Sequence, residues 1–86
     1  MEDSRMDYKE QVKKYLEYCE YRKELDWNTL KAYRIDLRQF FEFTQEDVPE
    51  KSKIEDYIVE LHKKYKQKTI KRKIASIKAY YNYLEE

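Results

Sequence analysis

Residues 67–84 read QKTIKRKIASIKAYYNYL and carry the clearest repeating pattern in the chain. Apolar residues recur in it every three or four positions, the spacing that places side chains on one face of an α-helix. Neither Gly nor Pro interrupts the stretch, so it predicts a helix over residues 67–84. The expected buried face consists of Ile70, Ile74, Ile77, Tyr81 and Leu84, with Tyr80 beside it.

The same spacing recurs in three earlier stretches. It predicts one helix over residues 6–23, a second from residue 27 to between 43 and 46, and a third from residue 52 to between 63 and 66. The residues expected to face the core are Tyr8, Val12, Tyr15, Leu16 and Cys19 in the first helix, Leu30, Tyr33, Leu37, Phe40 and Phe41 in the second, with Thr44 as a further candidate, and Ile54, Tyr57, Ile58 and Leu61 in the third.

Residues that can cap helices precede two of these stretches. Asp26 is the expected N-cap of the second helix, with Asn28 as the alternative. Ser52 and Glu55 have the spacing of a capping box for the third helix, in which hydroxyl and carboxylate each accept a hydrogen bond from the other residue's backbone amide. Residues 45–50 contain the only Pro and several acids and are expected to form a loop. The sequence therefore predicts one all-α domain, residues 1–86, folded as a compact four-helix bundle.

Composition excludes several classes of protein. The chain contains no Gly, which excludes Walker loops and dinucleotide-binding fingerprints, because both use Gly for close approach to phosphate. Charged residues make up 43% of the chain, so no apolar run approaches the roughly 20 residues of a membrane span. Since the N-terminus also lacks a signal-peptide pattern, we expect a cytoplasmic protein with no membrane partner.

The residues that most often carry catalysis or metals are scarce. Cys19 and His62 are the only residues of their types, so neither a multi-cysteine zinc site nor a paired-histidine site can form within the chain. The serines lack the Gly-flanked turn of a nucleophile elbow. We therefore expect no catalytic residue, metal, cofactor or small-molecule substrate.

The formal net charge of +1 conceals an uneven distribution. Residues 1–60 carry 11 basic and 16 acidic residues, whereas residues 61–84 carry eight basic residues and no acidic one. Two basic stripes stand out: Lys31, Arg34 and Arg38 on the second helix, and Lys68, Lys71, Arg72 and Lys78 on the fourth. Adjacent helices with such stripes would form a surface for DNA phosphates, and the alternative is a pair of solvated helix faces.

Two stretches together resemble a known family. Residues 25–43, LDWNTLKAYRIDLRQFFEF, are close to the pattern L-S-x-x-T-L-x-x-Y-x-x-D-L-x-x-F-x-x-F, and residues 69–84 are close to T-I-x-R-K-L-S-x-L-R-x-F-Y-x-Y-L. Over roughly residues 8–84 the chain is similar to the N-terminal core-binding domain of tyrosine recombinases, also called the phage-integrase SAM-like domain. The resemblance implies a SAM-like orthogonal bundle.

The resemblance also implies a function. Such a domain holds one side of duplex DNA with its second and fourth helices, while a separate domain supplies the catalytic residues for integration or recombination. The DNA-binding residues that it implies are Lys31, Arg34, Arg38, Lys68, Thr69, Lys71, Arg72 and Lys78. By itself the chain is expected to bind DNA and not to act as an enzyme. Duplex DNA and neighbouring recombinase protomers are the implied partners, with the isolated domain expected to be a monomer.

The residues also allow a second reading. Trp27 and Ile35 are apolar residues that the helical pattern does not place on the buried face, and several tyrosines lie off the apolar stripes. These side chains could belong to a helical protein-interaction module that dimerises or binds a partner protein. The two hypotheses differ because only DNA binding requires the basic excess after Glu60.

Overall fold

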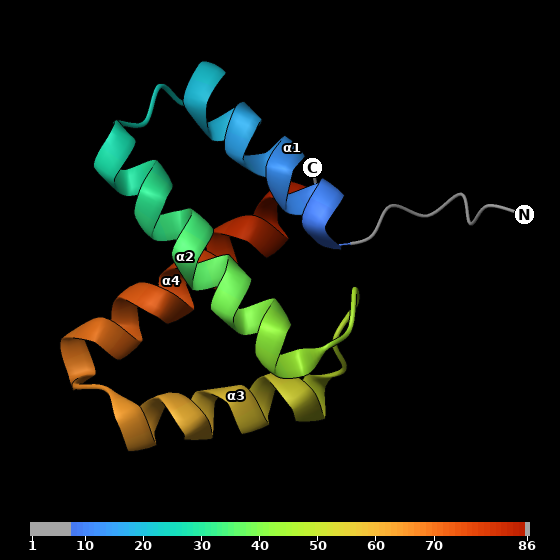
Figure 1. Ribbon diagram of the computed structural model, residues 1–86, viewed down its shortest axis with the longest axis vertical. Helices are drawn as coiled ribbons and strands as arrows, with labels where there is room; N and C mark the ends of the chain where they lie inside the picture. Colours follow the sequence, from blue (N-terminus) through green and yellow to red (C-terminus); the bar gives the residue numbers. More distant parts are fainter. Residues whose placement is uncertain (1–7, 86) are drawn as a thin grey trace, which may run out of the picture.

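The computed structural model describes residues 8–85, which form four helices and no strand (Figure 1). The helices are α1 (Tyr8–Tyr21), α2 (Trp27–Thr44), α3 (Lys51–Lys64) and α4 (Gln67–Glu85). The predicted all-α class and the predicted order of four helices are confirmed. The expected helix start at Met6 lies outside the described residues, and the expected end at Lys23 is two residues too late.

The central helix is α2, which packs against each of the other three. In Figure 1, α1 runs alongside α2 in the opposite direction, α3 crosses the C-terminal end of α2, and α4 crosses its middle. The far half of α4 also reaches α1, where the rings of Tyr15 and Tyr80 meet edge to face with centroids 5.4 Å apart. This crossed arrangement brings the middle of α2 against α4, about 35 residues further along the chain.

The predicted cap of α2 is confirmed. The Asp26 carboxylate accepts a hydrogen bond from the backbone N–H of Thr29 at 2.8 Å. This bond to the charged form holds the pKa of Asp26 below its usual value. The same side chain satisfies one of the backbone donors that the first turn of a helix leaves unpaired.

The predicted capping box of α3 is wrong. Helix α3 already begins at Lys51, and its N-cap is Glu50, whose side chain makes no capping hydrogen bond. The backbone N–H of Ile54 donates to the Glu50 carbonyl at 3.1 Å, so Ser52 lies inside the first turn rather than before it. A hydroxyl in that position cannot accept the bond that defines the box.

Aromatic rings form much of the core. Phe40 has no exposed surface, and its ring contacts those of Phe41, Tyr57 and Tyr81. Burial raises the pKa of Tyr57 and of Tyr80 to about 12, because the ionised phenolate loses its hydration. The buried apolar residues are Tyr15, Cys19, Leu37, Phe40, Phe41, Tyr57, Leu61, Ile70, Ile77 and Tyr80. A chain with few aliphatic residues thus fills its interior with tyrosine and phenylalanine.

The buried face of α4 departs from the predicted one at its C-terminal end. Tyr80 is 1% exposed, whereas Leu84, one turn further, is 44% exposed. Helical periodicity determines the direction in which Leu84 points. The side chain is buried only where another helix also packs beside the C-terminal end of α4. Among residues 8–85, no helix is both long enough and apolar enough to cross a membrane.

Candidate nucleic-acid interface

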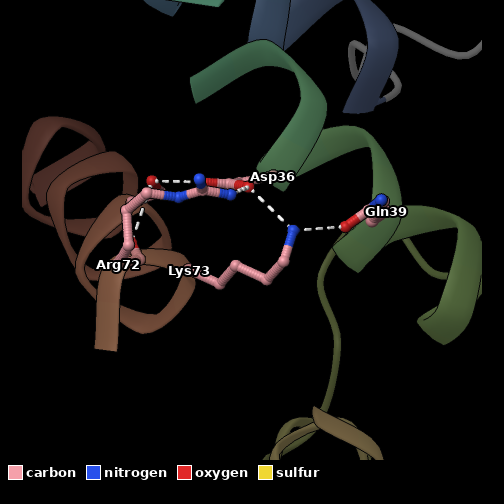
Figure 2. Close-up of polar contacts among 5 residues, drawn as sticks. Asp36, Gln39, Arg72 and Lys73 are labelled. Atoms are coloured by element: carbon pink, nitrogen blue, oxygen red, sulfur yellow. Dashed lines mark hydrogen bonds and ion pairs between the residues drawn. The ribbon is translucent and has the colours of Figure 1, made fainter. Parts of the chain in front are cut away.

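A buried carboxylate joins the two crossing helices. The side chain of Asp36, on α2, has no exposed surface and accepts hydrogen bonds from three residues of α4. Figure 2 shows Arg72 and Lys73 reaching Asp36 from the same side of α4. The donor atoms and their distances from the carboxylate oxygens are Arg72 Nη2 at 2.9 Å, Lys73 Nζ at 3.0 Å and Ser76 Oγ at 2.8 Å.

Lys73 belongs to the interior and not to the basic surface. Its side chain is 3% exposed, and its ammonium also donates to Gln39 Oε1 at 2.6 Å. The ring of Tyr65 adds a cation–π contact, with its centroid 5.1 Å from Nζ. Lys73 is one of the eight basic residues of the cationic stretch 61–84, but it adds no charge to the surface, because Asp36 neutralises it inside the fold.

The burial of Lys73 did have a signal in the sequence. Lys73 lies three residues after Ile70 and four before Ile77, which places it on the apolar stripe of α4. A lysine on such a stripe is fully buried only when it is paired. Asp36 borders the apolar face of α2, directly before Leu37, so two opposite charges on two buried faces already indicated a pair.

Arg72 lies at the edge of this buried cluster. Its side chain is 54% exposed, while one guanidinium nitrogen is held by the fully buried Asp36. The single negative charge of Asp36 therefore pairs with two cations, Arg72 and Lys73. One positive charge remains in excess, and it lies at the surface on Arg72. A guanidinium held in this way loses less conformational freedom when it binds a phosphate or a base edge.

The other site residues predicted on α4 lie along the same helix. Lys68, Lys71 and Lys78 are exposed, and Thr69 is half-buried. Lys68 and Thr69 are in the first turn of α4, where backbone N–H groups lack helical acceptors and the helix dipole favours anions. The first two turns of α4 therefore combine lysine charges, the anchored Arg72 and the positive end of a helix.

The predicted residues on α2 occupy a different surface. Lys31, Arg34 and Arg38 are exposed and line a groove between α1 and α2. Arg34 and Arg38 are each two residues from Asp36, roughly 200° around the helix, so they point away from α4. The structure does not join the two basic stripes into one continuous surface, because α2 turns Asp36 and Gln39 toward α4 instead.

Residues 8–85 contain no group of three or more side chains that could hold a metal ion. His62 is exposed on α3, and its Nδ1 lies 2.9 Å from the carbonyl oxygen of Ile58 one turn earlier. This is an ordinary contact of a helix surface.

The four-helix fold agrees with the all-α domain that the recombinase resemblance implies, and comparison with known proteins identifies the family. The family model described as "Phage integrase, N-terminal SAM-like domain" matches residues 12–86. A protein named "Tyrosine recombinase" from Agathobacter rectalis is 51% identical over 77 residues, which cover 86% of this chain and 25% of that protein. "Tyrosine recombinase XerC" from Leptospira interrogans serogroup Icterohaemorrhagiae serovar copenhageni is 33% identical over 82 residues, covering 87% of this chain and 26% of that protein.

The chain therefore spans about a quarter of the length of the curated relatives that it matches. No solved structure matches it. The family match nevertheless begins within α1 and includes all of α2, α3 and α4. The chain belongs to the family of phage-integrase N-terminal SAM-like domains.

Proposed function

We propose that the chain binds duplex DNA as the core-binding domain of a tyrosine recombinase. The observation that carries the proposal is Arg72, half-exposed at the start of α4 and anchored by the fully buried Asp36. The names of the relatives, both tyrosine recombinases, support a role in DNA recombination. The family match agrees with these names.

Binding would begin with the phosphates. Lys68, Thr69 and Lys71 surround the start of α4, where side-chain charge, free backbone N–H groups and the helix dipole all favour an anion. Each phosphate neutralised by a lysine or arginine releases condensed counterions, which favours binding at low salt. The planar fork of Arg72 suits a phosphate or the O6 and N7 atoms of a guanine. Lys78, two turns beyond, would extend the contact along the helix.

The basic residues of α2 would contribute less. Lys31, Arg34 and Arg38 remain candidate DNA contacts, but they lie on the α1 side of α2 rather than beside Arg72. Arg38 is also paired with Glu42, its Nε lying 3.4 Å from a carboxylate oxygen. A duplex seated on the start of α4 would reach these residues only at its margin.

Catalysis would belong to a separate domain. The domain described here would hold and position DNA in the cytoplasm, while that partner domain performs integration or recombination. On this proposal the 86-residue chain binds a duplex and leaves its strands intact.

The proposal can be tested by fluorescence anisotropy with a labelled, mixed-sequence duplex. The parent chain should bind at about 50 mM salt and much more weakly at about 200 mM. Arg72→Ala should weaken binding roughly 5- to 100-fold, and combining Lys68→Ala with Lys71→Ala should weaken it further. Lys63→Ala is the matched control, because it removes an exposed lysine of α3 that is not among the candidate DNA-binding residues.

Circular dichroism of each variant would verify that the helices are retained. The proposal fails if the parent chain binds no duplex at low salt. It also fails if Lys63→Ala weakens binding as much as Arg72→Ala does. A gel of the same reactions should show uncut strands.

A further inference from the structure

A groove runs along the outer side of α1 and α2, with a volume of about 570 Å³. Val12 and Leu16 of α1 and Leu30 of α2 contribute apolar side chains to it, and Trp27 stands at one end. Trp27 is 67% exposed. Partly exposed apolar side chains beside an exposed tryptophan are typical of a surface that another protein segment covers.

The charges around the groove change sign along its length. The start of α1 lies beside the end of α2, because the Tyr8 ring stacks on Phe41 and the Tyr15 ring stacks on Tyr33. One end of the groove is therefore basic, and the other end carries the carboxylates of α1. The basic end contains Lys9, Lys13, Arg34 and Arg38, and the acidic end contains Glu17 and Glu20.

Two residues of α2 soften this gradient without removing it. Glu42 lies at the basic end but is paired with Arg38, and Lys31 lies at the acidic end. Among the charged α1 residues that line the groove the order is strict, with two lysines followed by two glutamates. Within the part of the chain that the structure describes, no ion pair involves Lys9, Lys13, Glu17 or Glu20.

When a second copy of this surface is turned end to end, its acidic residues lie opposite the basic residues of the first copy. A two-fold interface brings the same surface of both copies together, so that surface must be self-complementary. An antiparallel second α1 would place Lys9 and Lys13 of each copy opposite Glu20 and Glu17 of the other. Val12 and Leu16, midway between the charged ends, would then meet their counterparts at the centre.

From these relationships we infer that the groove is a dimer interface, in which α1 of a second copy of this chain lies antiparallel to α1. Trp27 of each copy closes one end of the interface. Arg34 and Arg38 face the acidic half of the second copy's α1. The start of α4 stays uncovered, because Asp36 and α4 lie on the opposite side of α2. The inference does not depend on DNA binding and replaces the expectation of a monomeric isolated domain.

A helix of 14 residues is only about 21 Å long, so we expect the interface to be smaller than the roughly 800 Å² per partner of a standard interface. Dimerisation should therefore need high protein concentration and low salt. Sedimentation equilibrium of the 86-residue chain without DNA measures it directly. The emission of Trp27, the only tryptophan, should shift to longer wavelength as dilution dissociates the dimer.

Two charge-reversed variants provide the decisive experiment. One combines Lys9→Glu with Lys13→Glu, and the other combines Glu17→Lys with Glu20→Lys. Each variant alone should be monomeric, with dissociation constants raised at least tenfold, because like charges then face each other. An equimolar mixture should dimerise again, because the four charged groove positions of one α1 are then all acidic and those of the other are all basic. The matched control combines Lys14→Glu with Lys63→Glu, two exposed lysines outside the groove, and should dimerise like the parent.

Three outcomes would overturn the inference. The parent chain could remain a monomer at every concentration with an unchanged Trp27 emission. The mixture of charge-reversed variants could fail to pair although circular dichroism shows both to be helical. Trp27 emission could instead respond only to added duplex, which would assign the groove to DNA. The first two outcomes leave the Arg72 variants unaffected, so this inference can fail while the proposed function stands. Loss of duplex binding with a dimer retained would be the opposite case.

Discussion

The carboxylate of Asp36 and the ammonium of Lys73 lie 3.0 Å apart in the interior, with side chains 0% and 3% exposed. Removing two charges from water costs several kcal/mol per ion, which is recovered only when the geometry is good and the remaining donors are satisfied. Ser76 and Gln39 provide the additional hydrogen bonds. Since Asp36 and Lys73 lie 37 residues apart in the chain, the pair links one face of α2 to one face of α4.

Replacing one member of this pair should be costly. Asp36→Ala leaves the Lys73 ammonium buried without its counter-charge and is expected to lower the free energy of unfolding by about 3–5 kcal/mol. Ser76→Ala removes one hydrogen bond to the same carboxylate and should cost about 1 kcal/mol. Urea denaturation followed by circular dichroism would measure the free energy of unfolding of both variants. Equal losses would show that the ion pair contributes no more than a single hydrogen bond.

The hydroxyl groups of two buried tyrosines are expected to differ in their effect on stability. Tyr80 donates a hydrogen bond to Gln11 Oε1 at 3.1 Å, whereas the buried Tyr57 hydroxyl has no hydrogen-bond partner among the described residues. Tyr80→Phe should therefore destabilise the protein by about 1 kcal/mol, and Tyr57→Phe should be neutral or stabilising. Thermal unfolding of the two variants checks this, and the opposite order would contradict it.

Stability should decline in alkaline solution. The pKa of Tyr57 and of Tyr80 is about 12 in the folded protein against 10.0 for an unperturbed tyrosine. A raised pKa means that the unfolded chain loses its phenolic protons first, so the contribution to stability is full below about pH 10 and is lost as pH rises toward 12. Urea denaturation at a series of alkaline pH values would measure the decline. Because Tyr57→Phe removes one of these groups, the variant should show a shallower decline, and an unchanged slope would argue against this cause.

The cap at Asp26 predicts a contrast between two substitutions. Asp26→Ala removes the acceptor for the Thr29 N–H and should lower the melting temperature. Asp26→Asn keeps an oxygen acceptor, so it should retain most of the stabilisation that the cap provides. Acid should weaken the parent cap, because the lowered pKa of Asp26 means that this contribution is present above the usual carboxyl pKa and is lost as pH falls. Melting curves at neutral and acidic pH would test both points. Equal melting temperatures for the two variants would refute the capping role.

DNA binding should depend steeply on salt. The logarithm of the affinity should fall linearly with the logarithm of salt concentration, and Arg72→Ala should make that slope shallower by about one phosphate contact. Anisotropy titrations across a salt series measure the slope. Arg34→Ala should change the salt dependence less than Arg72→Ala does, because Arg34 lies on the groove side of α2. A larger change for Arg34→Ala would place the duplex on the groove instead.

Local patterns accounted for much of the fold. Apolar spacing and the absence of internal Gly or Pro predicted all four helices, because these features act within one or two helical turns. The Asp26 cap was predictable for the same reason, since it acts on a residue three positions away. The Ser52 capping box failed because the chain becomes helical immediately after Glu50, and the pattern does not determine which of two neighbouring residues begins the helix.

The sequence alone determined a four-helix domain with a basic C-terminal quarter, because periodicity and charge are properties of contiguous residues. Only the tertiary structure decided what those charges do. It buried Lys73 against Asp36, left Arg72 at the surface, and turned Arg34 and Arg38 toward α1 rather than α4. Each outcome depends on the angle at which α2 and α4 cross, and that angle comes from packing among residues far apart in the chain.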